Sequence, residues 1–160
     1  ASMSGPASPL AAALEPVLAE LMAATGALRC TVRIDHPALG YSANTPCAEV
    51  LAPGAASMMG DGSIDHRRAR SVRWVEKTRQ TLLQEDVFAD PEMAPPPALV
   101  RQFGTRSQMV APLIGFDDYV FGWVSAHFAE GPRPITAADV AAIEDARRAV
   151  LRVDGLPMGI

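Results

Sequence analysis

Two clusters of polar side chains have the composition of catalytic or metal-binding groups. Ser125 and His127 lie two residues apart in a β-forming run, so a strand would place both on one face, as a nucleophile and its base require. Asp61, Asp65 and His66 lie close together and could bind a cation. In each case a simpler interpretation is favoured, a structural pair for the first cluster and solvated loop polarity for the second. We therefore predict no catalytic residues and no metal site.

A third group is a basic run between Arg67 and Gln80, in a segment with the apolar spacing of a helix. The first interpretation is a solvated helix face. In the second, one or two arginines turn inward and pair with an anionic ligand, because a planar guanidinium matches carboxylate or phosphate. The third is a partner surface, and the net charge of −4 argues against nucleic acid as that partner. Six of the fourteen basic residues belong to this run: Arg67, Arg68, Arg70, Arg73, Lys77 and Arg79.

The stretch from Thr105 to Glu130 predicts a β-hairpin around which the other elements are organised. Ser107–Ile114 and Tyr119–Phe128 are rich in β-branched and aromatic residues, typical of strands buried on both faces. The residues between them, Gly115 to Asp118, have turn chemistry. Alternation in the second strand predicts one face that mixes aromatic and polar tips, suited either to a ligand pocket or to the core. Its members are Phe121, Trp123, Ser125 and His127.

The glycine-rich loop Pro53–Asp65 is predicted to be irregular and exposed, and it could close over a ligand. Met58 and Met59 are soft side chains that suit either pocket walls or loop anchors. Trp74 gives the helix part of its apolar side. The predicted ligand-binding side chains are Met58, Met59, Ile64, Arg70, Trp74, Phe121, Trp123, Ser125 and His127.

The remaining chain predicts helices at both ends and further strands between them. An apolar stripe from Leu10 to Met22 indicates a helix, with Pro16 marking either a kink or a start near Glu15. The run Leu28–Asp35 alternates and predicts a half-exposed strand carrying arginines on its outer face. Further strands are predicted at 47–52 and 81–87, a short helix at 97–103, and a last helix capped by Thr136. Neighbouring strands in sequence favour antiparallel pairing and an α+β fold.

Length and composition indicate a single ordinary domain. The chain has 160 residues, of which 49% are apolar and 20% charged, enough to bury a core. We expect a disordered tail at 1–8, one domain at 9–155 and a short tail at 156–160. No apolar run approaches the roughly 20 residues that span a bilayer. The first residues lack a basic leader, so a cytoplasmic protein is expected.

Four phrases in this order resemble the GAF domain family and together cover nearly the whole chain. They are Val17–Asp35, Ser71–Pro91, the paired strands Arg106–Ile114 and Tyr119–Phe128, and the closing helix Ile135–Val150. The resemblance implies a GAF-like (profilin-like) central antiparallel sheet of five to six strands. It also implies terminal helices on one face and a ligand pocket under a covering loop and helix on the other.

The resemblance does not carry over the best-known chemistry of the family. Cyclic-nucleotide members resemble an Asn-Lys-x-Phe pattern, and here only Phe88, Asp90 and Glu92 match. Bilin-binding members attach the chromophore to a pocket cysteine, and methionine-sulfoxide reductases of the family need a reactive thiolate and a second thiol. Cys30 and Cys47 are both predicted in strands, away from such positions.

The resemblance and the residues together predict a non-enzymatic sensory domain that takes part in signal transduction. It would bind an unidentified small organic ligand, form a homodimer through its terminal helices and act on a signalling protein, with no cofactor, nucleic acid or membrane contact. One alternative is a dimerisation or protein-interaction module with a filled pocket. The other is an enzyme like the free methionine-(R)-sulfoxide reductases, which the cysteine positions disfavour.

Overall fold

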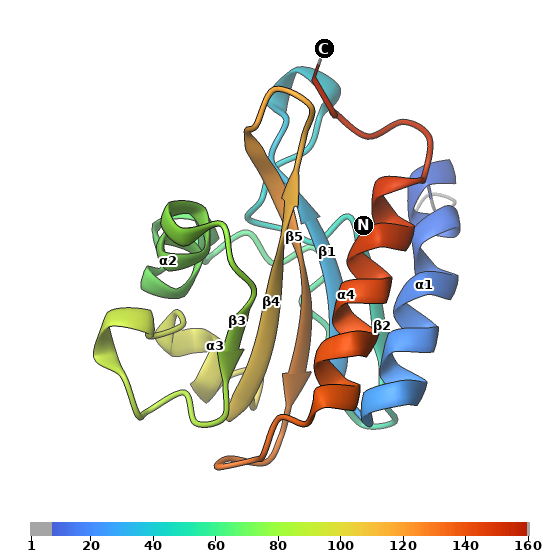
Figure 1. The fold of residues 1–160 in the computed structure, drawn as a ribbon. Helices are drawn as coiled ribbons and strands as arrows, with labels where there is room; N and C mark the ends of the chain where they lie inside the picture. Colours follow the sequence, from blue (N-terminus) through green and yellow to red (C-terminus); the bar gives the residue numbers. More distant parts are fainter. Residues whose placement is uncertain (1–7, 160) are drawn as a thin grey trace.

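Five antiparallel strands form one sheet in the order β2–β1–β5–β4–β3 in the computed structural model, which describes residues 8–159 (Figure 1). The predicted α+β fold is confirmed, with helices on both faces of this sheet. Of the predicted tail at 1–8, residues 1–7 lie outside the described part, whereas Ser8 caps the first helix. The strands are β1 (Arg29–Ile34), β2 (Ala48–Leu51), β3 (Leu82–Gln84), β4 (Ser107–Ile114) and β5 (Val120–Phe128).

The predicted hairpin of β4 and β5 is confirmed, but it contains a bulge. Leu113 pairs with Gly122 and Ile114 with Val120, so Phe121 is an extra residue in β5. Phe121 therefore packs into the core beneath the terminal helices, while Trp123 belongs to the cluster on the opposite side. The predicted face shared by Phe121 and Trp123 is wrong, because two-residue alternation does not continue through a bulge.

Gly122 in β5 pairs with Ile34 and lies against the backbone of β1. A Cβ atom at this position would overlap the carbonyl oxygen of Arg33 in β1. Glycine is therefore required by the close contact of the two backbones rather than by its φ angle.

The helices α1 (Pro9–Thr25) and α4 (Ala137–Leu151) cover one face of the sheet (Figure 1). Helix α1 is capped by the Ser8 hydroxyl and ends at Gly26, which adopts φ 74°. It begins at Pro9, so the alternative start near Glu15 is wrong; Pro16 is exposed and its ring does not meet the core. The capping box of Thr136 and its third helical residue opens α4 as predicted. Among residues 8–159, no helix has both the length and the hydropathy to cross a membrane.

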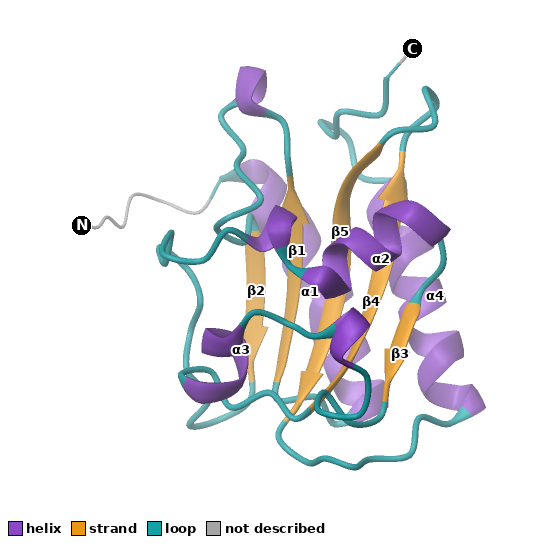
Figure 2. Ribbon diagram, turned by 90° about the vertical axis from the view of Figure 1, so that its left-hand side faces the viewer, coloured by secondary structure: helices purple, strands orange, loops and turns teal. Residues whose placement is uncertain are grey.

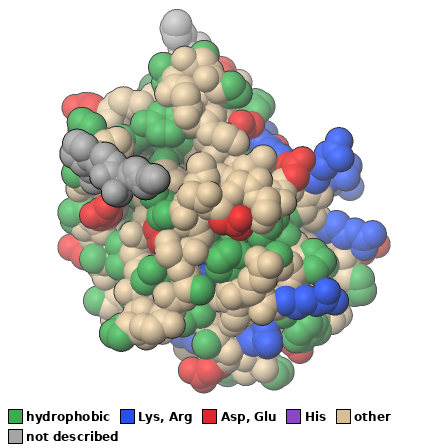
Figure 3. Space-filling view, turned by 180° about the vertical axis from the view of Figure 1, so that it is seen from behind, with side chains coloured by type: hydrophobic (Ala, Val, Ile, Leu, Met, Phe, Trp, Pro, Cys, Tyr) green, Lys and Arg blue, Asp and Glu red, His purple; other side chains and the backbone are tan. Residues whose placement is uncertain are grey.

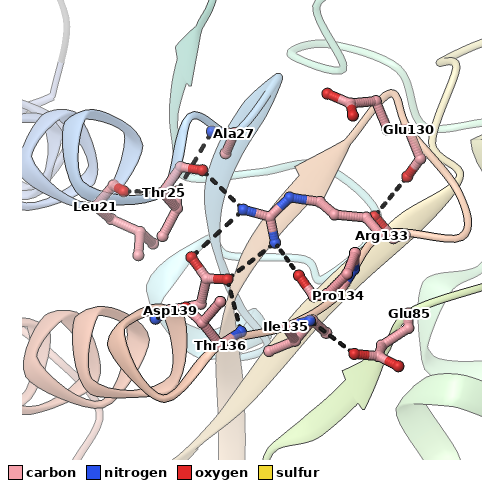
Figure 4. A network of polar contacts seen from close by, with 11 residues as sticks. Leu21, Thr25, Ala27, Glu85, Glu130, Arg133, Pro134, Ile135, Thr136 and Asp139 are labelled. Atoms are coloured by element: carbon pink, nitrogen blue, oxygen red, sulfur yellow. Dashed lines mark hydrogen bonds and ion pairs between the residues drawn. The ribbon is translucent and has the colours of Figure 1, made fainter.

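Arg133 joins the end of α1 to the start of α4 (Figure 4). Its Nη2 donates to the Thr25 carbonyl at 3.0 Å and its Nη1 to Asp139 Oδ2 at 3.0 Å. The guanidinium carbon also lies 3.9 Å from the centre of the Phe128 ring. Burial opposes ionisation of Asp139, but the hydrogen bonds from Arg133 and Thr136 outweigh it and lower the pKa of this carboxyl. This network fixes the spacing of the two terminal helices.

The opposite face is covered by short helices and loops at residues 52–81 and 85–106, which we call the roof (Figure 2). This arrangement confirms the expected separation of the terminal helices from the covering segment. Within the roof lie α2 (Arg70–Thr78), α3 (Pro97–Arg101), η2 (His66–Arg68) and η3 (Pro91–Met93), and η1 (Pro37–Leu39) lies between β1 and β2.

Strand β1 departs from the prediction of a half-exposed strand. All six of its residues are buried, and Arg29 and Arg33 are 0% and 2% exposed. Alternation predicts one buried and one solvated face, but the roof covers the second face of β1 as the terminal helices cover the first. The arginines therefore point into the protein.

The turn between β4 and β5 contacts two distant segments. Arg79, which ends α2 with φ 62°, forms an ion pair with Asp118 at 3.2 Å. On the same turn, the backbone N–H of Phe116 donates to the carbonyl of Met158, beyond α4. The turn thus links the roof helix to the residues that follow α4.

Candidate functional site

A row of polar side chains crosses the roof side of the sheet. The strand register places Arg29 opposite His127, His127 opposite Gln108, and Gln108 opposite Gln84. None of the four is more than 4% exposed. Gln108 Nε2 donates to Gln84 Oε1 at 2.8 Å, so the outer end of the row is internally paired. A buried polar layer of this kind is costly unless its groups are hydrogen-bonded, which makes the partners of each side chain informative.

Arg29 is almost fully satisfied by the roof. Its Nε and Nη2 both donate to the Ala56 carbonyl, at 3.0 and 2.8 Å, and Nη2 also donates to the Phe103 carbonyl at 2.9 Å. Its Nη1 lies 3.4 Å from Thr105 Oγ1 and 3.2 Å from His127 Nδ1. One side chain therefore ties two roof loops to the centre of the sheet. We infer that its role is structural.

Arg33 is as deeply buried but has far fewer partners. Its Nη1 donates to the Ala43 carbonyl at 2.9 Å, and its Nη2 contacts only the Met58 sulfur at 3.7 Å. Among residues 8–159 no carboxylate forms an ion pair with it. Burial lowers the pKa of Arg33 to about 10, with the field of Glu49 opposing the shift. It remains charged at neutral pH, because that value lies well above 7.

A cavity of about 20 Å³ lies beside Arg33, between the sheet and the roof. This volume holds about one water molecule. Thr31 Oγ1, on the same face of β1, is buried and has no hydrogen-bond partner among the described residues. The lining mixes polar and apolar side chains on both the sheet and the roof: Arg33, His66, Ser71, Val72, Pro96, Leu99, Gln108, Val110, Trp123, Ser125 and His127.

Two histidines in this lining are held neutral. Burial and the nearby Arg33 lower the pKa of His66 to about 3. Burial, together with Arg29 and Arg33, holds the pKa of His127 well below its usual value. Because Arg29 only donates, His127 Nδ1 accepts in their contact and the ring proton resides on Nε2. The cavity therefore presents a permanent cation beside uncharged imidazoles.

The structure brings together some of the predicted ligand-binding residues. Trp123, Ser125 and His127 line the cavity. Met58 is 1% exposed and touches Arg33, and Ile64 packs with it in a small roof cluster. Ser125 and His127 do lie on one face, as predicted.

The other predicted residues lie elsewhere. Met59 is 49% exposed, and Phe121 belongs to the core under the terminal helices. Arg70 and Trp74 line a separate groove on the outside of α2. Sequence reasoning missed the other polar residues of the row and the cavity, namely Arg29, Arg33, His66, Ser71, Gln84 and Gln108. One signal could have indicated that the arginines are buried. Their strand, β1, pairs with β5, and the composition of β5 is typical of a strand buried on both faces.

One arginine of the basic run does turn inward, but toward the protein's own acids. Arg67 forms ion pairs with Asp35, at 2.8 Å, and with Glu76. Its guanidinium also lies 5.5 Å from the Tyr119 ring centre and 5.6 Å from that of Trp123. Arg67 thus anchors the roof at the edge of the cavity and is not free to bind an anion.

The two thiols and the acidic loop show no reactive arrangement. Burial raises the pKa of Cys30 and of Cys47 to about 12 each, the reverse of what a thiolate nucleophile needs. In the described part of the chain, no three His, Cys, Asp or Glu side chains gather as a metal site would require. Asp61, Asp65 and His66 therefore do not form one.

Comparison with known proteins gives a family and a set of similar folds. The sequence profile of the GAF domain matches residues 9–150. No curated protein sequence matches the chain.

Among solved structures, the fold is similar to light-sensing GAF domains. The PixJ GAF domain of Thermosynechococcus elongatus in its blue-light-absorbing form superposes with a TM-score of 0.66 at 22% identity, over 89% of this chain and 85% of that one. The phycocyanobilin-bound GAF domain of a cyanobacterial phytochrome superposes with a TM-score of 0.67 at 17% identity, over 90% of this chain and 83% of that one. The chromophore-binding domain of a bacteriophytochrome from R. palustris superposes with a TM-score of 0.64 at 17% identity, over 91% of this chain and 55% of that one.

Proposed function

The chain belongs to the GAF domain family, and we propose that it is a sensory domain whose ligand is a small organic anion held at Arg33. The observation that carries this proposal is a buried guanidinium beside a cavity, bonded to one carbonyl and one sulfur. A guanidinium in the interior is costly unless its donors are bonded, and a carboxylate accepts two of them at once. A ligand carboxylate at this position would supply the missing acceptors.

The ligand would enter by displacing the roof. A cavity of about 20 Å³ is much smaller than the several hundred Å³ typical of small-molecule pockets. The described conformation is therefore the closed one, and a ligand that binds only an opened form would shift the population toward it. This shift of the roof is the proposed signal.

The cavity does not favour a bound tetrapyrrole or catalysis. Neither cysteine lines the cavity, so it offers no thiol for the covalent attachment of a bilin. The raised pKa values of Cys30 and Cys47 disfavour a sulfoxide reductase. We accordingly propose a non-enzymatic role.

A homodimer through α1 and α4, acting in the cytoplasm, completes the proposal. A shallow groove of about 170 Å³ runs between the two helices. Small and apolar side chains on both sides of it allow another helix to approach closely. They are Val17, Leu21, Ala24, Ala142, Ala146 and Ala149, and the acidic side chains of Glu20 and Asp145 line the same groove.

The second candidate function is a protein-interaction module without a ligand. The observation that favours it is the filled interior, in which Met58 and Trp123 are 1% and 3% exposed. Such a module would keep the roof closed and use its surface alone.

Fluorescence of Trp123 separates the two functions. The chain has two tryptophans, and Trp74→Phe leaves Trp123 at the cavity as the reporter. We expect members of a library of small carboxylates to change this emission and raise the melting temperature. Arg33→Met should abolish both effects. Arg101→Met, on the exposed surface of α3, is the matched control.

A carboxylate that binds equally well to Arg33→Met would contradict the proposed anchor. If the whole library leaves both signals unchanged, and native mass spectrometry of the purified protein shows the mass of the polypeptide alone, the interaction module is the correct function.

A further inference from the structure

We propose that the outer face of α2 is a docking surface for an acidic segment of a partner protein. An open groove of about 500 Å³ lies on this face, away from the cavity at Arg33. Figure 3 shows Lys and Arg side chains gathered along the edge of the molecule where α2 lies. The groove is lined by Arg70, Arg73, Trp74, Lys77 and Glu92.

The lining follows from the helical spacing of α2. Residues 70, 73, 74 and 77 recur at intervals of three and four, so they form one stripe. Val72 and Val75 lie on the opposite side and are buried at 4% and 1% exposure. Because the valines fix the helix against the sheet, the basic stripe must face outward.

The cations of this stripe lack acidic partners. Within residues 8–159 no carboxylate forms an ion pair with Arg70, Arg73 or Lys77. Arg70 donates only to the Pro91 carbonyl, at 3.1 Å. By contrast, Arg67 and Arg79 of the same basic run both form ion pairs. Three unpaired cations against Glu92 make the groove positive on a chain of net charge −4.

Trp74 gives the stripe an apolar centre. Its side chain is half-buried against the cluster that contains Val72, Val75 and Trp123, so the indole is held in place with part of its surface exposed. Fixed aromatic side chains ringed by charge are characteristic anchors of protein interfaces.

The shape of the groove favours a peptide segment over an enclosed small molecule. Small-molecule sites bury most of their ligand, whereas Arg70, Arg73 and Lys77 are all exposed. Arg70 and Lys77 are about 10 Å apart along the helix axis. In an extended segment, residues four apart span about 13 Å on one side. A Glu-x-Phe-x-Glu pattern would therefore place the aromatic ring on Trp74 and a carboxylate near each end of the stripe.

A labelled peptide tests this surface. The probe is a fluorescein-labelled peptide with a central Glu-Gly-Phe-Gly-Glu sequence, measured by fluorescence anisotropy against the whole chain. We expect binding that weakens as salt is raised, and about tenfold weaker binding to Arg73→Glu/Lys77→Glu. Trp74→Ala should weaken binding without changing its salt dependence. Arg101→Glu, which removes an exposed cation outside the groove, should bind like the wild type.

Circular dichroism melting of each variant shows whether it is folded, and a peptide with Gln in place of Glu should not bind. The proposal is overturned if the acidic peptide binds Arg73→Glu/Lys77→Glu as well as the wild type, or if it does not bind at all. It is also overturned if vesicles of phosphatidylserine or free ATP, rather than the peptide, bind in a manner lost in that variant. None of these results would contradict the proposed anion site at Arg33, because the groove and the cavity share no lining residue.

Discussion

The two faces of this sheet are built from the same strands but have opposite chemistry. On the face under α1 and α4 the strands bury apolar side chains, including Cys30, Val32 and Val124, each 0% exposed. Beneath the roof the same strands bury Arg29, Arg33 and His127. Successive residues of β1 enter the two environments in turn, because neighbouring side chains of a strand point to opposite faces of the sheet.

This difference indicates that the apolar face under the helices stabilises the fold, whereas the polar face under the roof is the one that can respond to a ligand. Apolar burial under the helices is non-directional, and close packing leaves no space there for another molecule. The polar layer depends on individual hydrogen bonds, which another molecule can replace. We therefore expect the helix side to dominate the stability and the roof side to change with conditions.

The largest expected effect comes from the helix side. Leu18→Ala removes a fully buried side chain and leaves a cavity, and should lower the free energy of unfolding by about 2–5 kcal/mol. Urea denaturation followed by circular dichroism measures this loss. A loss below about 1 kcal/mol would mean that the apolar face is not the main source of stability.

The next effect distinguishes the two buried arginines. Arg29→Met leaves the carbonyls of Ala56 and Phe103 without their donor and should cost about 2–4 kcal/mol. Arg33→Met removes a poorly bonded charge and should stay within about 1 kcal/mol of the wild type or exceed it. The same urea titration compares them. Equal losses for both variants would show that Arg33 is as structural as Arg29.

The smallest effect is a dependence on pH carried by the roof-side histidines. The folded-state pKa of His66 is about 3 and that of His127 is also depressed, so the unfolded chain binds more protons below pH 6.5. Stability should therefore fall as pH falls, by about 1 kcal/mol for each histidine between pH 6.5 and 5.5. Carboxylates titrate mainly below this window.

His66→Gln should remove about half of this loss when unfolding is measured at the two pH values. An undiminished loss in the variant would assign the pH dependence to other groups. Leu18→Ala, on the other face, serves as the reference and should retain the full dependence.

Elements with local signals were predictable, and the contents of the site were not. The hairpin, the Gly26 stop and the Thr136 cap each depend on neighbouring residues, and all appear as expected. The burial of Arg29 and Arg33 depends on a roof contributed by distant segments, which alternation in β1 does not reveal. Phe121 was misplaced because a bulge leaves no mark in a run of apolar residues.

The turn at Asp118 has a mechanical consequence. Asp118 forms an ion pair with Arg79 at the end of α2, and Phe116 in the same turn donates to the Met158 carbonyl. The turn therefore joins the cover of the cavity to the irregular segment after α4. A tilt of α2 would therefore reach that segment, in which Leu156 and Met158 pack against the apolar core. A movement of the roof would then be transmitted at the edge of the sheet, by way of the turn between β4 and β5.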